Sequence, residues 1–328
     1  MPHSFADAGP NARRASDFAT EHEAARRELI DSLRQPQARV SPKYFYDALG
    51  SKLFEAICEL DEYYLTRIEA GIFKHFGAEI ALATTSGGAL IDLGAGNCKK
   101  AAALFPALRP ALYAPVDISI EFLKGAMEAL QTRYPAIKML PIGEDFSENL
   151  CLPAAVQKFR DKLFFYPGSS LGNFAPLAAT QFLQRIRAAC GPDGGELLIG
   201  VDLIKDQRIL QAAYDDPLGV TAAFNLNLLR HVNSILGSDF EIGAWRHQAF
   251  FNAAQSRIEM HLAARTAVTV SFPGGTRHFA KGETIHTENS YKFSRAGLLG
   301  MLQRAGFGDA TCWSDQQENY LVCHARAI

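Results

Sequence analysis

The 328-residue sequence lacks several features that mark common protein classes. No apolar run approaches the length of a membrane-spanning helix, and residues 1–15 lack the apolar core of a signal peptide. The formal net charge is only −2, no dense Lys/Arg block is present, and no internal repeat is detectable. These absences predict a cytoplasmic protein with no membrane partner and no nucleic-acid partner.

Metal-binding and disulfide patterns are also missing. The six cysteines are scattered without Cys-x-x-Cys spacing, so we expect reduced thiols rather than a disulfide framework or a zinc site. The nine histidines show no paired ligand spacing, and no metal is expected. What is present is ordinary globular composition, 48% hydrophobic and 21% charged, in a chain expected to be a monomer of one or two domains.

The most informative stretch begins with a short apolar run at residues 89–93, which is typical of a buried parallel strand. Gly94 and Gly96 follow, and a helix is predicted over 99–108. Glycines between a strand and a helix let the backbone approach a ligand closely. Lys99 replaces the third glycine of a dinucleotide fingerprint, and no Gly-Lys-Ser/Thr is present. The remaining Asp-x-Gly-x-Gly resembles the first motif of class I S-adenosylmethionine (SAM) methyltransferases.

Two later strand ends carry residues suited to the same cofactor. The predicted strand 111–116 ends at Asp117, whose carboxylate can accept hydrogen bonds from both ribose hydroxyls. The predicted strand 137–142 is followed by Glu144, Asp145 and Phe146, an acidic and aromatic group suited to an adenine ring.

Strands and helices alternate through the middle of the chain, which predicts a mainly parallel sheet. Further strands are expected at 162–166 and 195–201, and further helices at 119–132, 150–158 and 176–190. The glycine-rich loop after the fourth strand, residues 167–176, contains Gly168 and Asn173 and suits contacts with an amine; a plain turn with Asn173 as N-cap is the alternative.

The pattern changes after residue 201, where helices and long strands precede a closing helix-strand-strand. This ending resembles the antiparallel end of a class I methyltransferase sheet. The expected fold is therefore α/β, with a class I SAM-methyltransferase Rossmann-like sheet and a second α+β domain. The expected divisions are a disordered tail at 1–15, a substrate domain at 16–65 plus 202–290, and a SAM domain at 66–201 plus 291–328. Substrate would bind in the cleft between the two domains.

Nearly the whole chain beyond residue 18 resembles the histidine Nα-methyltransferases of ergothioneine biosynthesis. This family converts L-histidine to its trimethyl betaine, hercynine, with three molecules of SAM. The stretches that carry the resemblance are residues 44–47, 62–67, 92–96, 168–173, 214–216, 219–225, 257–260 and 287–293.

The resemblance implies a site, position by position. The SAM residues would be Gly94, Lys100, Asp117, Asp145 and Phe146. The histidine residues would be Tyr63, Gly168, Asn173, Tyr214, Glu288 and Ser290, with Tyr46 near the amine. Among them, Asn173 and Tyr214 would hold the carboxylate, while Glu288, Ser290 and Tyr63 would hold the imidazole. Departures from the family pattern, such as Leu65 where many relatives have proline, remove none of these residues.

The implied reaction is in-line methyl transfer to the neutral α-amine, with Tyr46 or a water that it orients relaying the proton and Asn173 positioning the substrate. Positioning should contribute more than acid-base chemistry. Three other interpretations stay open. One is methylation of a different small amino acid or amine. Another is a catalytically silent SAM- or amino-acid-binding protein, and the last is a nicotinamide dehydrogenase, which the missing third glycine disfavours.

Overall fold

The computed structural model describes residues 10–147 and 149–328. The chain divides into two compact units. The larger, the sheet unit, comprises Tyr46–Thr221, Ala249–Glu259 and Asn289–Ile328. The smaller unit comprises residues 10–45, Ala222–Gln248 and Met260–Glu288. Residues 46–65, 202–221, 249–259 and 289–290 thus group with the sheet, in contrast to the expected domain boundaries.

The sheet unit is built on one mixed sheet in the order β12-β13-β6-β5-β1-β2-β3, with the short β4 also pairing with β2. The strands are β1 (Ala89–Leu93), β2 (Leu112–Asp117), β3 (Lys138–Met139), β4 (Ile142–Gly143), β5 (Lys162–Tyr166), β6 (Glu196–Asp202), β12 (Phe307–Ser314) and β13 (Tyr320–Ala327). Only β13 runs against its neighbours β6 and β12, whereas the other pairs are parallel. The class I sheet expected from the sequence is confirmed.

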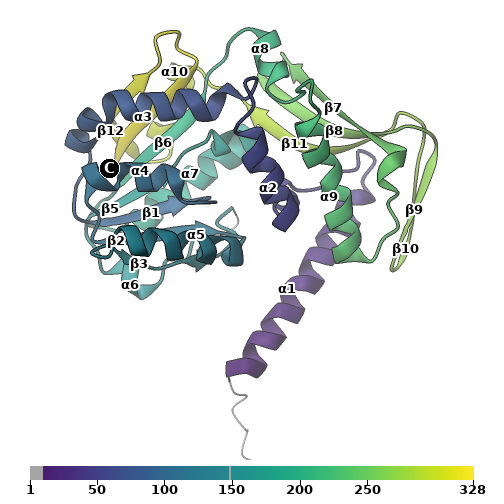
Figure 1. The fold of residues 1–328 in the computed structure, drawn as a ribbon, viewed down its shortest axis with the longest axis horizontal. Coiled ribbons are helices and arrows are strands. Elements are labelled where there is room, and N and C mark those ends of the chain that lie inside the picture. The colour runs from purple at the N-terminus through teal and green to yellow at the C-terminus, as the bar shows by residue number, and fades with distance from the viewer. Residues whose placement is uncertain (1–9, 148) are drawn as a thin grey trace, which may run out of the picture. The chain divides into compact units, whose positions relative to one another are not determined.

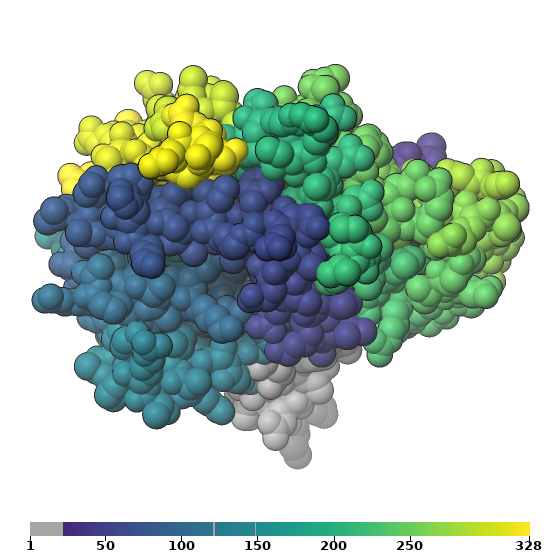
Figure 2. Space-filling model, turned by 45° about the horizontal axis from the view of Figure 1, so that its top comes forward, coloured from purple at the N-terminus to yellow at the C-terminus, as the bar shows by residue number. Residues whose placement is uncertain are grey.

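Helices cover both faces of this sheet (Figure 1). The helices of the unit are α2 (Ala48–Ile57), α3 (Tyr64–Ala83), α4 (Lys99–Leu108), α5 (Ile120–Arg133), α6 (Ala154–Gln157), α7 (Pro176–Cys190), α8 (Gln207–Ala212) and α10 (Arg295–Arg304), with the 3-10 turn η2 (Ser170–Asn173). On one face, α3 packs beside α4 and against β12 and β13; Figure 2 shows this helix (blue) next to the C-terminal residues (yellow). On the other face α7 packs beside α10.

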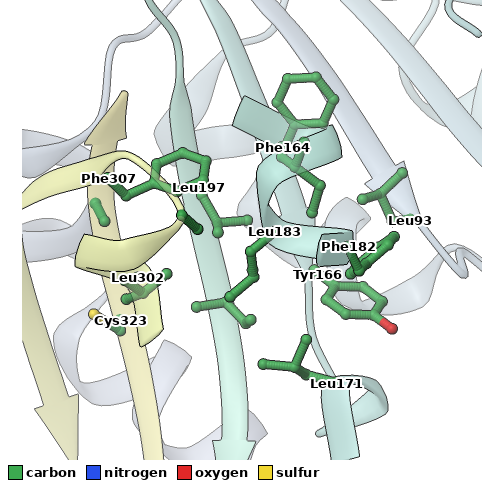
Figure 3. Packing of buried hydrophobic residues seen from close by; sticks show 14 of the residues in the cluster. Leu93, Phe164, Tyr166, Leu171, Phe182, Leu183, Leu197, Leu302, Phe307 and Cys323 are labelled. Carbon is green, nitrogen blue, oxygen red and sulfur yellow. The ribbon is translucent and has the colours of Figure 1, made fainter. Parts of the chain in front are cut away.

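The core on the second face explains why the central strands are continuous apolar runs. Figure 3 shows Phe182 and Leu183 of α7 and Leu302 of α10 packed against sheet residues such as Leu197. Strands β1, β5 and β6 are buried along their whole length because helices cover both faces. Burial of each large apolar side chain contributes roughly 1.5–3 kcal/mol.

The smaller unit consists of α1 (Pro10–Leu33), η1 (Pro42–Phe45), most of α9 (Val220–Leu236), η3 (Ile242–Ala244) and strand segments. Strands β9 (Val268–Phe272) and β10 (Gly275–Phe279) form the expected hairpin. A three-stranded sheet, β11-β8-β7, is made by β7 (Trp245–Asn252), β8 (Arg257–Ala264) and β11 (Thr284–Tyr291), and the boundary between the units falls within these strands. Within the unit, the rings of Phe45 and Phe224 stack with centroids 4.5 Å apart.

Three local expectations are corrected. The expected strand 137–142 is interrupted into β3 and β4, because Pro141 between them has no N–H for a sheet hydrogen bond. The first helix begins at Pro10, so residues 10–15 of the expected disordered tail are helical; residues 1–9 of that tail lie outside the described residues. Strand β7 has no counterpart among the expected elements, because polar residues 246–248 obscure its alternation.

Candidate active site

The glycine loop after β1 and the carboxylate after β2 are in direct contact. Gly94 and Gly96 have φ values of +71° and +51°, a conformation that favours glycine. The Gly96 N–H donates to Asp117 Oδ2 at 2.9 Å, and the Ser119 N–H donates to Asp117 Oδ1 at 2.9 Å. The first two predicted cofactor segments therefore lie together at the carboxyl edge of the sheet, where doubly wound folds bind ligands.

The acidic and aromatic group after β4 lies at the same edge. The rings of Phe146 and Tyr166 are edge to face, with centroids 6.0 Å apart. A Cβ atom added at Gly94 would lie 3.6 Å from Phe146 Cζ, so the aromatic ring borders the glycine loop. Asp145 accepts from the Ser147 N–H at 3.0 Å. Glu144 Oε2 is buried and has no hydrogen-bond partner among the described residues, which leaves an acceptor open for a ligand.

Lys100 and Gly168, predicted for the cofactor and the substrate respectively, are joined by a residue that the sequence did not single out. Glu69 on α3 is 1% exposed. Its Oε2 lies 2.6 Å from Lys100 Nζ, and its Oε1 accepts from the Gly168 N–H at 2.8 Å and from Tyr320 Oη at 2.7 Å. One buried carboxylate thereby fixes both a cation at the start of α4 and the backbone of the loop after β5.

That loop turns sharply before it reaches Asn173. Gly168 has φ +79°, and a Cβ there would lie 3.1 Å from Lys100 Nζ. A Cβ at Gly172 would lie 2.8 Å from the Tyr291 carbonyl, so this position has no room for a side chain. Asn173 ends η2, is half-buried, and its side chain makes no hydrogen bond to the described residues. Its amide is therefore available to a ligand at the edge of the sheet.

Aromatic rings connect Tyr46 with Tyr214. Phe54 is edge to face with Tyr46 on one side and with Tyr63 on the other, at centroid distances of 5.8 and 6.1 Å. Tyr63 in turn contacts the Tyr214 ring at 6.1 Å. Ser119 Oγ donates to the Tyr46 carbonyl at 3.0 Å, which attaches this row to the loop after β2. Three predicted substrate-side tyrosines thus belong to one packed row.

Tyr214 and Ser290 meet through their hydroxyls, which are 2.7 Å apart. Lys292 lies beside both: its Nζ is 2.8 Å from Ser290 Oγ and 3.1 Å from Tyr214 Oη. The same nitrogen is 3.0 Å from Asp202 Oδ2. These four residues, which we call the hydroxyl cluster, are all buried.

Glu288 precedes Ser290 by two residues on β11, so both side chains lie on the same face of that strand. By residue grouping Glu288 belongs to the smaller unit and Ser290 to the sheet unit. That Glu288 binds an imidazole stays a prediction.

The strand acid behind the glycine loop has a shifted pKa. Asp92 is 2% exposed, and burial raises its pKa to about 7 although Tyr113 Oη donates to Asp92 Oδ2 at 2.7 Å. Burial disfavours the charged carboxylate, and one hydrogen bond only partly offsets that penalty. Asp92 therefore changes protonation near neutral pH.

Known proteins with related sequences identify the family. The model of the SAM-dependent, histidine-specific methyltransferase family matches residues 25–327. Histidine N-alpha-methyltransferase of Mycolicibacterium smegmatis is 38% identical to this chain, across 92% of this chain and 94% of its own length. The chain belongs to this family.

Two further relatives of this chain extend the comparison. Histidine N-alpha-methyltransferase of Mycobacterium tuberculosis is 37% identical, across 91% of this chain and 94% of its own length. Ergothioneine biosynthesis protein 1 of Neurospora crassa is 30% identical, across 82% of this chain but only 31% of its own length. The chain is thus a SAM-dependent methyltransferase, and its cofactor is SAM. Among the described residues, no helix is both long and apolar enough to cross a membrane.

Three residues of the site were missed from the sequence: Glu69, Asp202 and Lys292. Each is a buried charge with at least one partner far away in the chain: 251 residues separate Glu69 from Tyr320, and Asp202 on β6 pairs with Lys292, which follows β11. The only local signal is a charge at an otherwise apolar position, such as Lys292 between Tyr291 and Phe293. That signal is weak because charged residues in strands are usually exposed.

Proposed function

We propose that this methyltransferase transfers methyl groups from SAM to the α-amine of L-histidine, and that three successive transfers yield hercynine, the first step towards ergothioneine. The observation that carries the proposal is that the chain has every SAM and histidine residue that the resemblance implies. All of them except Glu288 belong to the sheet unit, together with the glycine loop. The Nα-histidine activity of the mycobacterial relatives, as their names state it, supports the proposal.

The residues at the carboxyl edge fit SAM. Gly94 and Gly96 bring backbone close to the site, and Asp117 would accept from the ribose hydroxyls. Asp145 and Phe146 would contact the adenine, beside the open acceptor of Glu144. Lys100, held by Glu69, would face the carboxylate end of the cofactor. When bound, SAM supplies a sulfonium methyl group that an amine nitrogen can attack in line with the departing sulfur.

The protein's own contribution to the reaction is mainly orientation. Asn173 would hold the substrate carboxylate through its amide, with Tyr214 beside it, so that the α-amine faces the methyl group. Glu288 and Ser290 would hold the two imidazole nitrogens, since neutral imidazole has one donor and one acceptor. The amine must lose a proton before each attack, and Tyr46 or a water bound to it would carry that proton away. A tyrosine is a weak base near neutral pH, so this relay contributes less than the alignment.

A second candidate is the same reaction on another small amino acid or amine. The relative N-methyltransferase fsqC of Aspergillus fumigatus is 27% identical across 89% of this chain, and its name specifies no histidine. On this reading, substrate choice would depend on the residues implied for the imidazole, Glu288, Ser290 and Tyr63.

The test is mass spectrometry of the purified protein's reaction with SAM and L-histidine. We expect histidine to gain one, two and finally three methyl groups, with the trimethyl product accumulating. Parallel reactions with L-phenylalanine and with histamine, which lacks the carboxylate, serve as controls. Unmodified histidine, together with intact SAM binding measured by calorimetry, would mean that the enzyme methylates another amine.

A further inference from the structure

Lys292 is a fully buried cation in the hydroxyl cluster that no step of the proposed reaction uses. Its side chain is 0% exposed, as is that of Asp202. The ammonium group has three N–H donors and three oxygen partners: Ser290 Oγ, Tyr214 Oη and Asp202 Oδ2. Its hydrogen-bonding capacity is therefore used within the protein, and Lys292 is not itself a ligand for substrate.

Asp202 fixes this lysine to the end of β6. Tyr64 Oη donates to Asp202 Oδ2 at 2.7 Å, and Lys205 donates to Oδ1. The backbone is also tied, because the Phe293 N–H donates to the Asp202 carbonyl at 2.9 Å and the Ile204 N–H donates to the Phe293 carbonyl at 3.0 Å. The position of the ammonium group is thus set by the rigid sheet rather than by a loop.

The charge of Lys292 determines the direction of the neighbouring hydrogen bonds. An ammonium group can only donate, so both Ser290 Oγ and Tyr214 Oη accept from it. When Tyr214 donates the bond between the two hydroxyls, Ser290 Oγ accepts twice, and its own hydrogen must point out of the cluster. The Tyr214 hydrogen is then used within the cluster, which leaves the substrate carboxylate to the Asn173 amide. Burial alone would lower the pKa of Lys292, but Tyr214 and Asp202 hold this pKa above its usual value, which keeps the group charged.

We propose that Lys292 is a positioning residue for substrate specificity, which orients the Tyr214 and Ser290 hydroxyls so that Ser290 offers its O–H to the unprotonated imidazole nitrogen of the substrate. The proposal rests on the proposed function. The proposal explains how the site would select a substrate ring that has an unprotonated nitrogen. A protonated imidazolium and a phenyl ring both lack a hydrogen-bond acceptor for the Ser290 hydroxyl.

The test compares Lys292→Met with Lys205→Met. Both lysines are buried and contact Asp202, but Lys205 contacts neither Ser290 nor Tyr214, its other partners being Tyr64 Oη and the Leu203 carbonyl. We expect Lys292→Met to raise the KM for histidine about tenfold, the loss of one oriented hydrogen bond, with little change in kcat or in the Kd for SAM. The preference for histidine over phenylalanine should fall by a similar factor. Lys205→Met should leave both quantities near wild type.

A double-mutant cycle with Ser290→Ala separates positioning from general damage. If Lys292 acts through the hydroxyls, the double variant should have nearly the same KM as Ser290→Ala alone. Fully additive losses, or equal KM changes in the Lys292 and Lys205 variants, would overturn the proposal. Lys292→Gln, which keeps a donor, serves the same comparison if the methionine variant does not fold. Failure of the wild-type enzyme to methylate histidine would instead reject the proposed function itself.

Discussion

Two regions of the molecule hold polar groups in place in different ways. One is the carboxyl edge of the sheet around Gly94, Gly96, Asp117 and Phe146, which we call the cofactor edge, and the other is the hydroxyl cluster. At the cofactor edge, polar groups come from the backbone and from loop residues directly after strands, and the contact of Gly96 with Asp117 joins positions only 21 residues apart. In the hydroxyl cluster, Tyr214 and Ser290 are 76 residues apart, and Lys292 and Asp202 are buried charges. The first site can be recognised from short motifs, whereas the second depends on tertiary structure.

The two regions also differ in the free-energy cost of placing their polar groups. The backbone polar groups of a glycine turn at the edge of a sheet need few hydrogen bonds from the protein, because water can still solvate them. A buried ion pair stabilises the fold only if its geometry and remaining hydrogen bonds offset the cost of desolvation. The residues of the hydroxyl cluster should therefore be sensitive to loss of a single partner, while those of the cofactor edge should tolerate more change.

Glu69 is the most severe test of this contrast, since it is a buried carboxylate that supports both Lys100 and the Gly168 backbone. Glu69→Gln removes the charge that pairs with Lys100 and weakens the acceptor for Gly168 and Tyr320. Loss of one partner of a buried pair costs about 3–5 kcal/mol. We expect a loss within this range, because three donors are affected although the Lys100 side chain is 37% exposed. Urea unfolding should show the loss of stability, and calorimetry should show weaker SAM binding.

Glu79→Gln is the matched control for that variant. Glu79 lies on the same helix but is exposed, and it accepts one hydrogen bond, from Trp313 Nε1 at 3.1 Å. Its substitution should change the free energy of unfolding by less than ~1 kcal/mol. Equal effects of the two substitutions would mean that Glu69 is an ordinary helix residue.

Asp92 gives the next largest effect, on the dependence of stability on pH. Its pKa is raised by burial from 3.8 to about 7 in the folded protein. The folded state therefore binds more protons than the unfolded state between these values, so this residue's stabilising contribution falls as pH rises from about 4 to about 7. The difference between these two pKa values corresponds to at most ~4 kcal/mol.

Asp92→Asn should remove this dependence, because asparagine does not titrate and its amide oxygen can still accept from Tyr113. Urea unfolding at pH 5 and at pH 8 measures the difference for each protein. The wild-type free energy of unfolding should fall more between these pH values than that of the variant. Parallel pH profiles would show that Asp92 does not titrate in this range.

These contrasts also explain what could be predicted from the sequence. The parallel sheet, the strands around residues 89–93 and 162–166 and the glycine loop follow from local signals, namely apolar runs of strand length and turns that require glycine. Strand ends then place Gly94, Asp117 and Phe146 at one edge, because parallel strands share their carboxyl end. For the hydroxyl cluster, the family resemblance supplied Tyr214 and Ser290, but no local pattern supplied their buried support.

The features that could not be predicted from the sequence have the same physical origin. Although Ser290 lies two residues from Lys292, nothing nearby in the chain indicates the Asp202 carboxylate that makes the burial of this lysine tolerable. Nor does any neighbour of Glu69 in the chain indicate its pairing with Lys100. Strand β7 was missed because Arg246, His247 and Gln248 interrupt the apolar pattern of a partly exposed strand. Long-range compensation is decided by packing and cannot be seen in a short window of sequence.

A smaller change tests the cofactor edge alone. Phe146→Leu removes the ring that borders Gly94 and packs on Tyr166, and it keeps an apolar side chain. We expect the Kd for SAM to rise about tenfold, because aromatic packing is worth about 0.5–1.5 kcal/mol beyond area. The KM for histidine should stay unchanged. Phe159→Leu, in the same core but away from the loops at the edge, should leave SAM binding near wild type.

Asn173→Ala makes the complementary change on the substrate side, with the smallest expected effect. The Asn173 amide has no hydrogen-bond partner among the described residues, so its removal should leave the melting temperature unchanged. Loss of one hydrogen bond to the substrate carboxylate, worth about 1 kcal/mol, should raise the KM for histidine roughly fivefold, with the Kd for SAM unaltered. Ser170→Ala in the same turn, whose hydroxyl donates to the Pro167 carbonyl at 3.2 Å, controls for disturbance of the turn itself. If Asn173→Ala instead weakened SAM and left histidine unaffected, the loop after β5 would belong to the cofactor edge, and the division between the two sides would have to be redrawn.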